Sequence, residues 1–259
     1  MMNKLAQLIR EYKQLGIDQQ IDYDKLYLYS IITHSTAIEG STITEIENQL
    51  LFDNGISANK PIYEQLMNLD LKAAYTKAFQ MADNHDLIDD KKLRELSSLV
   101  MKNTGSEYNT AIGSFNSANG DFRLLNVTAG FNGRSYLSWQ KISAKINEFC
   151  QWLNLERSQI STNKIEKIYE LSFQAHYHLV TIHPWADGNG RMARIVMNMI
   201  QKEFNMIPSI VKKEHKAQYI QSLSDAQEND DIKIFLDFMT DEHIKNITHR
   251  IKEYQKSIQ

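Results

Sequence analysis

The stretch His183-Pro-Trp-Ala-Asp-Gly-Asn-Gly-Arg-Met-Ala-Arg194 combines reactive side chains with a glycine-rich turn. Because a proline disfavours helical backbone at the residue before it, a helix that precedes this stretch should end at His183. Apolar residues recur at helical spacing from Met192 to Met199, directly after the turn. The stretch therefore predicts a helix–loop–helix unit that presents an imidazole at its first junction, and we expect the rest of the chain to hold this unit.

The composition is that of an ordinary globular protein. The chain has 259 residues, 42% of them hydrophobic and 24% charged, and is long enough to bury a sizeable core. Its net charge of −3 provides no basic surplus, which argues against a nucleic-acid partner. The N-terminus is too polar for a signal peptide, and no apolar run approaches the roughly 20 residues that span a bilayer. Cys150, the one cysteine, permits no intramolecular disulfide, so we expect a cytoplasmic protein without a membrane partner.

Helical periodicity dominates the chain and predicts an all-α fold with one small β-hairpin. Between Asn103 and Ser138 the composition shifts to Gly, Asn, Ser and Thr. Within that region we expect a strand over 122–128 and a hairpin turn at Asn132-Gly133. The helices are expected over about 3–14, 22–37, 44–51, 62–83, 89–101, 139–154, 163–181, 190–204, 213–226 and 231–255.

The residue types of the central stretch suit nucleotide chemistry. His183 is a candidate general base, and Asp187 offers the oxygen ligand that Mg²⁺ takes when substrate phosphates complete its shell. The Gly188-Asn189-Gly190 turn lets backbone N–H groups converge on an anion at a helix N-terminus. Arg191 and Arg194 lie in the first turns of that helix, against its dipole, which indicates an anionic ligand nearby. A base, a metal ligand, a phosphate cradle and two arginines are what transfer from a nucleotide requires.

From His183 to Arg194 the sequence resembles the signature of Fic-domain proteins, His-Pro-Phe-x-Asp/Glu-Gly-Asn-Gly-Arg-x-x-Arg, with Trp185 in place of the phenylalanine. The resemblance implies a Fic-type helical domain that transfers AMP from ATP, with Mg²⁺, to a Ser, Thr or Tyr hydroxyl of a target protein. It leaves self-modification and homodimer formation open.

The same resemblance implies a role for each polar residue of the stretch. His183 would deprotonate the target hydroxyl, and Asp187 would hold Mg²⁺ between the α- and β-phosphates. The turn residues Gly188, Asn189 and Gly190 would cradle phosphates with Arg191, and Arg194 would hold the γ-phosphate. Glycine at position 190 favours AMP transfer, since relatives that phosphorylate their targets carry lysine there.

Two further segments are similar to family elements. Gly120 to Arg123, Val127-Thr128-Ala129-Gly130 and Tyr136 resemble a flap hairpin that docks the target segment by strand pairing. Tyr219 resembles a position near the adenine pocket.

An N-terminal segment, Ser35-Thr-Ala-Ile-Glu39-Gly40, matches the family's inhibitory motif Ser/Thr-x-x-x-Glu-Gly/Asn. Ser35 and Glu39 are four residues apart and share one face of a helix. The resemblance implies that Glu39 pairs with Arg194 and occupies the γ-phosphate site. We therefore expect an N-terminal helical region over 1–60, which carries the inhibitory helix, and a Fic core over 61–259.

Three other functions are weighed against AMP transfer. A metal hydrolase could use His176, His178 and His183 with Glu170, but the first two point to different faces of a helix, unlike an i, i+4 metal pair. A non-catalytic nucleotide-binding or interaction module would need a degenerate site, and every expected polar residue is present. Removal of AMP from a target, supported by Glu39, is left open.

Overall fold

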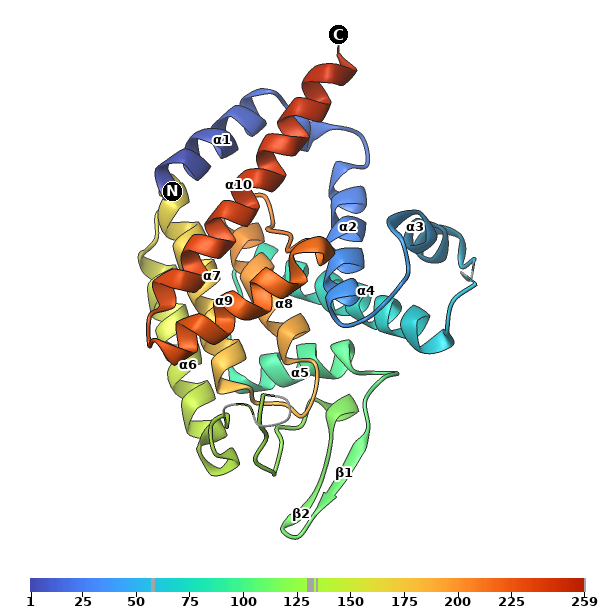
Figure 1. Ribbon diagram of the computed structural model, residues 1–259, viewed down its shortest axis with the longest axis vertical. Helices are drawn as coiled ribbons and strands as arrows, with labels where there is room; N and C mark the ends of the chain where they lie inside the picture. The colour runs from blue at the N-terminus through green and yellow to red at the C-terminus, as the bar shows by residue number, and fades with distance from the viewer. Residues whose placement is uncertain (57–58, 130–132, 134, 259) are drawn as a thin grey trace.

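The computed structural model describes residues 1–56, 59–129, 133 and 135–258. Within these ranges the chain forms ten α-helices and one two-stranded antiparallel sheet, which confirms the predicted all-α fold with a small hairpin (Figure 1). None of the helices so described has both the length and the apolar composition to cross a bilayer. The elements are α1 (Met2–Gln14), α2 (Tyr23–Ile38), α3 (Glu45–Asn54), α4 (Ile62–Asp83), α5 (Asp90–Val100), β1 (Glu107–Thr110), β2 (Gly113–Asn116), α6 (Ile142–Gln159), α7 (Ile165–Ile182), α8 (Asn189–Glu203), α9 (Lys216–Glu228) and α10 (Ile232–Ser257).

Helix α8 is the central element of the fold. Every side chain from Arg191 to Gln201 is buried, and the helix packs between α7 and α4 (Figure 1). Two of its buried polar side chains bond to neighbouring segments: the Asn198 amide donates to the Tyr75 hydroxyl at 3.1 Å, and the Gln201 side-chain carbonyl accepts from the Ser209 N–H at 2.6 Å. Because unpartnered buried polar groups are costly, these bonds fix the rotation of α8 and the direction of its first turn.

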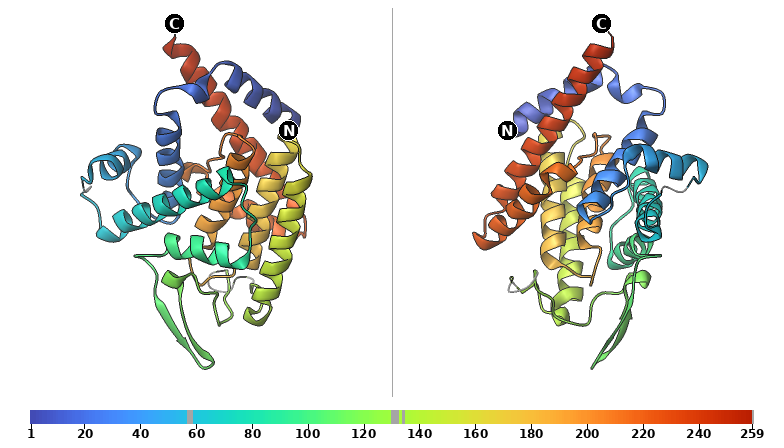
Figure 2. Two further views of the ribbon diagram at one scale, coloured as in Figure 1. Left: turned by 180° about the vertical axis from the view of Figure 1, so that it is seen from behind. Right: turned by 45° about the vertical axis from the view of Figure 1, so that its right-hand side comes forward.

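The two N-terminal helices α1 and α2 share the hydrophobic core with α8. Leu5, Ile9 and Tyr12 of α1 are buried, and α1 packs against α10 and α7. Helix α2 packs against α4 and also contacts α8 (Figure 2). This packing brings the C-terminal end of α2 beside the first turns of α8.

A buried polar network ties α2 to α3 and α4. The Asn68 carbonyl on α4 accepts from the Thr36 hydroxyl and from the Asn48 side-chain amide, each at 2.8 Å. Helix α3 begins with the predicted capping box, in which Thr44 and Glu47 exchange hydrogen bonds, and extends to Asn54 rather than about residue 51. The network therefore fixes the helix that carries Ser35 and Glu39.

The predicted strand over 122–128 is wrong. The hairpin lies at β1 and β2, where Tyr108 and Phe115 face each other with ring centroids 4.9 Å apart, and it projects from the helical body (Figures 1 and 2). Residues 122–128 are irregular because Phe122 and Arg123 are pulled into the core, and only Thr128 forms a bridge, to Ser135. Of the predicted turn at 132–133, the first residue lies outside the described ranges.

Candidate active site

Helix α7 ends at the predicted boundary, and His183 follows it in the left-handed backbone region with φ 51°. This region is unfavourable for residues other than glycine, so the conformation needs outside support. Arg123 supplies it: its backbone N–H donates to the Pro184 carbonyl at 3.0 Å and its Nε donates to the His183 carbonyl at 2.8 Å. The imidazole is therefore presented by a strained junction that a distant segment holds in place.

The imidazole of His183 is half-buried and stacks on the ring of Tyr136, with centroids 3.8 Å apart. Burial, aided by the positive charge of Arg123, lowers the pKa of His183 to about 4. Its Nδ1 is buried without a hydrogen-bond partner among the described residues. At neutral pH the ring is uncharged and can accept a proton, as a general base must.

Arg123 is a residue whose role the sequence analysis missed. Its side chain is fully buried, and besides the His183 carbonyl it donates to the carbonyls of Leu125 at 2.6 Å and Leu137 at 2.5 Å. No carboxylate pairs with it within the described ranges, and burial lowers its pKa. The one sequence signal was a lone arginine beside apolar residues at 122–125; nothing local indicated that it contacts a histidine 60 residues later.

The side chain of Asn189 closes the Gly-Asn-Gly turn. The Asn189 amide accepts from the Trp185 N–H at 3.1 Å and donates to the Trp185 carbonyl at 2.9 Å. Trp185 is buried, and its indole donates to the Gly120 carbonyl at 3.1 Å. Gly188 has φ 83°, and a Cβ there would lie 3.0 Å from the Met101 sulfur. The first-turn N–H groups of α8, which have no intrahelical acceptors, are the groups able to meet an anion.

Asp187 is the exposed acid of the turn. One of its oxygens accepts from the Gly188 N–H at 2.6 Å, and the other lies 3.5 Å from Arg191 Nη2. In the described part of the chain no three His, Cys, Asp or Glu side chains gather into a metal cluster. A single protein carboxylate fits Mg²⁺, which takes its remaining ligands from phosphates and water.

Arg194 is buried on α8 and bound by α2. Its Nη2 lies 2.5 Å from Glu39 Oε1, and its Nε donates to the Ser35 hydroxyl at 2.8 Å. Burial alone would raise the pKa of Glu39, but the charge and hydrogen bond of Arg194 outweigh it and hold that pKa below its ordinary value. Helix α2 stops directly after this contact, because Gly40 has φ 106°. The segments at 35–40 and 183–194 thus meet in an ion pair.

Gly190 leaves room for that ion pair. A Cβ at this position would lie 3.0 Å from Glu39 Oε1 and 3.1 Å from Arg194 Nη1. A larger side chain would press on both partners, so glycine is the residue that this arrangement accepts.

A cavity of about 330 Å³ joins most of these groups. Its wall includes His183, Glu39, Gly190, Arg194 and Tyr219. The predicted adenine-pocket residue therefore lies on the same cavity as the candidate base. It is buried, and its hydroxyl is 2.9 Å from His176 Nε2 and 3.4 Å from Arg194 Nη1.

Two of the predicted flap residues line this cavity. Ala129 and Tyr136 line it, and the Val127 carbonyl accepts from the Tyr136 N–H at 3.0 Å. Thr128 forms the bridge to Ser135, whereas Gly130 lies outside the described residues.

The metal-hydrolase alternative is wrong. His176 is fully buried, stacks on Phe235, and has its pKa lowered by burial to about 3. His178 is exposed and packs against Trp152 with ring centroids 4.9 Å apart. Glu170 pairs with a lysine on the surface of α7. These side chains do not converge on a common point.

Comparisons with known proteins point to one family. Residues 87–201 match the model of the Fic/DOC family. The protein adenylyltransferase Fic of Culex quinquefasciatus is 29% identical over 213 residues, 81% of this chain and 39% of that protein. The protein adenylyltransferase fic-1 of Caenorhabditis elegans is 26% identical over 202 residues, 76% of this chain and 35% of that protein. The chain thus spans about two fifths of the length of the curated relatives it matches.

Solved structures share the fold. Residues 134–508 of C. elegans Fic-1 superpose with a TM-score of 0.79 at 22% identity, covering 99% of this chain and 72% of that one. A Fic-domain-containing signalling protein from Bacteroides thetaiotaomicron VPI-5482 gives a TM-score of 0.77 at 22% identity, covering 96% and 97%. This chain therefore shares its fold with solved Fic-domain structures, and residues 87–201 match the model of the Fic/DOC family.

Proposed function

We propose that this protein transfers AMP from ATP to a hydroxyl side chain of a target protein, and that Glu39 holds it inactive in the resting state. The observation that carries the proposal is the Glu39–Arg194 ion pair on a cavity that also contains the His183 imidazole. The match to the Fic/DOC family and the curated names of its relatives as protein adenylyltransferases support it.

His183 would act as the general base. Its neutral ring would take the proton of a target Ser, Thr or Tyr hydroxyl as that oxygen attacks the α-phosphorus of ATP. The bond from the α-phosphorus to the bridging oxygen would break, and pyrophosphate would leave with its electron pair. The imidazolium would then release its proton to water. The lowered pKa of His183 suits this role, because the ring stays uncharged in the absence of substrate.

The first turns of α8 would hold the phosphates. Gly188, Asn189 and Gly190 would present backbone N–H groups, and Arg191 and Arg194 would neutralise charge. Asp187 would hold Mg²⁺, which when bound neutralises the phosphate oxygens and orients them. The side chain of Asn189 closes the turn, so its contribution to phosphate binding is that of its backbone.

Glu39 would inhibit by pairing with Arg194, the residue that would otherwise bind the γ-phosphate. Removing one partner of a buried ion pair costs about 3–5 kcal/mol. An energy of that size changes a rate by a factor of roughly 10²–10⁴. Glu39 keeps 31% of its side chain exposed whereas Arg194 keeps 3%, so Glu39 is the partner free to leave. In this proposal residues 1–60 are the regulatory region and residues 61–259 are the transferase core.

The flap residues Val127, Thr128, Ala129 and Gly130 would dock the target segment by strand pairing, and Tyr219 would contact the adenine. The target could be another protein or a second copy of this chain. A homodimer would bring such a second copy close.

The test is mass spectrometry of the Glu39→Gly variant incubated with ATP, Mg²⁺ and cell lysate. We expect AMP on protein hydroxyls in this sample and none with the Glu39→Gly, His183→Ala double variant. A Glu39→Gly sample without transferred AMP would contradict the proposal and favour a non-catalytic nucleotide-binding module.

A further inference from the structure

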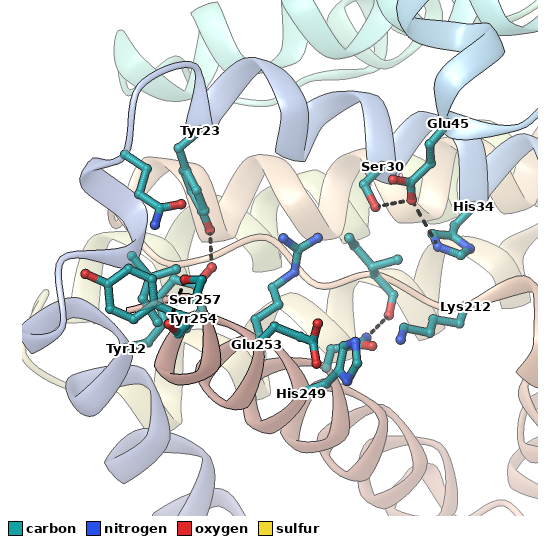
Figure 3. Close-up of a pocket in the computed structure, with 15 residues that line it drawn as sticks. Tyr12, Tyr23, Ser30, His34, Glu45, Lys212, His249, Glu253, Tyr254 and Ser257 are labelled. Carbon is teal, nitrogen blue, oxygen red and sulfur yellow. Dashed lines mark hydrogen bonds and ion pairs between the residues drawn. The ribbon is translucent and has the colours of Figure 1, made fainter. Parts of the chain in front are cut away.

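A second cavity, of about 590 Å³, lies between α2 and α10 and is larger than the candidate active site. Figure 3 shows Ser30, His34 and Glu45 on one wall and His249 and Glu253 of α10 on the opposite wall. Lys212 lies toward one end of the group (Figure 3). Tyr12, Tyr23 and Tyr254 lie toward the other end (Figure 3). None of these residues belongs to the site described above.

The acidic side chains that line this cavity have polar partners nearby. Glu45 accepts from the Ser30 hydroxyl at 2.7 Å and lies 3.4 Å from His34 Nε2. Glu253 pairs with a lysine on its own helix at 3.4 Å. Both carboxylates of the cavity are therefore already engaged.

Neither cation of the cavity has a carboxylate within ion-pair distance in the described part of the chain. Arg250 lies with its guanidinium 4.4 Å from the ring centroid of Tyr27, and neither Arg250 nor Lys212 forms an ion pair within the described residues. A guanidinium stacked on an aromatic face keeps its N–H groups free at its edge, where they match the oxygens of a carboxylate or phosphate. Arg250 is thus held in place beside the Tyr27 ring and the Tyr12 hydroxyl, and no carboxylate of the described residues lies within ion-pair distance of it.

We propose that this cavity binds a small organic anion through a phosphate or carboxylate group that Arg250 and Lys212 hold. Its volume is that of ordinary small-molecule sites, which lie at about 300–1,000 Å³. The tyrosine side chains at the other end offer ring faces and hydroxyls to the remainder of such a ligand.

The cavity shares a helix with the inhibitory contact. Ser30 and His34 are four residues apart and wall the cavity, whereas Ser35 and Glu39 are four residues apart and hold Arg194. A movement of α2 that released Arg194 would remove one wall of the cavity.

Because a ligand stabilises the arrangement that binds it, an anion in this cavity favours the resting position of α2. It therefore reinforces inhibition. This part of the inference rests on the proposed function, whereas the binding of the anion does not.

Thermal unfolding tests the binding. Inorganic phosphate, citrate and AMP are each titrated into the wild-type chain at constant ionic strength set with sodium chloride. At least one should raise Tm saturably, by about 5 °C or more near 100-fold saturation. The rise should be absent in Arg250→Gln and reduced in Lys212→Gln, but retained in Lys252→Gln, which removes an exposed cation outside the cavity on the same helix.

Lys212→Gln decides the test if Arg250→Gln does not fold. No saturable rise with any of the three anions overturns the inference. An equal rise in the wild type and in the cavity variants, as AMP bound only at the active site would give, overturns it too.

Transfer of labelled AMP tests the coupling. A bound anion should lower transfer by the wild-type chain several-fold and leave the Glu39→Gly variant unchanged. Binding without that difference overturns the coupling but leaves the proposed function intact. A Glu39→Gly variant that transfers no AMP overturns the proposed function and leaves the binding result standing.

Discussion

Ser35 binds Arg194 twice, because its hydroxyl accepts from Nε at 2.8 Å and its carbonyl accepts from Nη2 at 3.1 Å. The guanidinium that would hold the γ-phosphate is therefore attached to α2 by a backbone group as well as by two side chains. Removing either side chain alone should therefore weaken this attachment without abolishing it.

Glu39→Gln should activate the protein most. The variant keeps the shape of the side chain but loses its charge, so Arg194 becomes available to a phosphate. Transfer of labelled AMP should rise by roughly 10²-fold or more. Glu11→Gln, an exposed neutralisation on α1, is the matched control and should behave as the wild type. Equal transfer by both variants would remove Glu39 from the inhibitory role.

Ser35→Ala should activate the protein less. It removes one hydrogen bond to a charged group and leaves the Ser35 carbonyl in place, a change worth about 1.5–3 kcal/mol. Transfer should rise by roughly 10-fold to 100-fold in the same assay. Ser35→Thr retains a hydroxyl and should stay close to the wild type, whereas activation by both variants would indicate general disruption of α2.

The pH dependence of transfer should reflect the lowered pKa of His183. With the pKa at about 4 rather than 6.5, the ring remains neutral through mildly acidic solutions. We expect the acid limb of kcat/KM against pH, measured in the Glu39→Gly background, to fall near pH 4. A limb centred near pH 6.5 would mean that the pKa of His183 is not lowered in the active protein.

His243 should make folding sensitive to acid. It is fully buried, neither ring nitrogen has a partner among the described residues, and burial lowers its pKa to about 3. Between pH 3 and 6.5 the unfolded chain therefore binds more protons at this residue, so its contribution to stability is lost as pH falls from 6.5.

Replacement of His243 should consequently flatten the stability profile. His243→Leu removes both unpartnered nitrogens and should be stabilised relative to the wild type at pH 5, by about 1 kcal/mol, in urea unfolding. At pH 8 the difference should shrink. A constant difference across this range would indicate a packing effect alone.

The sequence predicted the helices well because their signals are local. Apolar periodicity located α8, the Thr44–Glu47 capping box located the start of α3, and Pro184 set the end of α7. The central stretch and the inhibitory motif could be joined in advance only through a family resemblance. Periodicity does not indicate which residue of a distant helix meets Arg194.

Two features were missed for physical reasons. The hairpin of β1 and β2 turns at Ala111-Ile112, without the Asn-Gly or Asp-Gly pair that marks a tight turn, and its stability depends on the cross-strand Tyr108–Phe115 pair. Arg123 was read as part of a strand, but its burial is a tertiary effect: three carbonyls from separate segments meet around one guanidinium.

Arg123→Lys should therefore impair transfer without impairing ATP binding. A lysine ammonium keeps the charge but not the planar geometry that serves the carbonyls of Leu125, His183 and Leu137 together. The strained backbone at His183 should relax and misplace the imidazole, so kcat in the Glu39→Gly background should fall by roughly 10²-fold with little change in KM for ATP.

The neutral substitution Arg123→Met removes the positive charge that Arg123→Lys retains. Comparing the two variants distinguishes the electrostatic effect of Arg123 on His183 from its effect on the position of the imidazole. Because the positive charge of Arg123 helps to lower the pKa of His183, its loss should move the acid limb of kcat/KM upward from pH 4. Arg94→Gln removes a half-exposed arginine that packs on the neighbouring Phe122 and should leave that limb in place. If Arg123→Met lowered stability but left both kcat and the acid limb unchanged, Arg123 would support the loop without positioning the base.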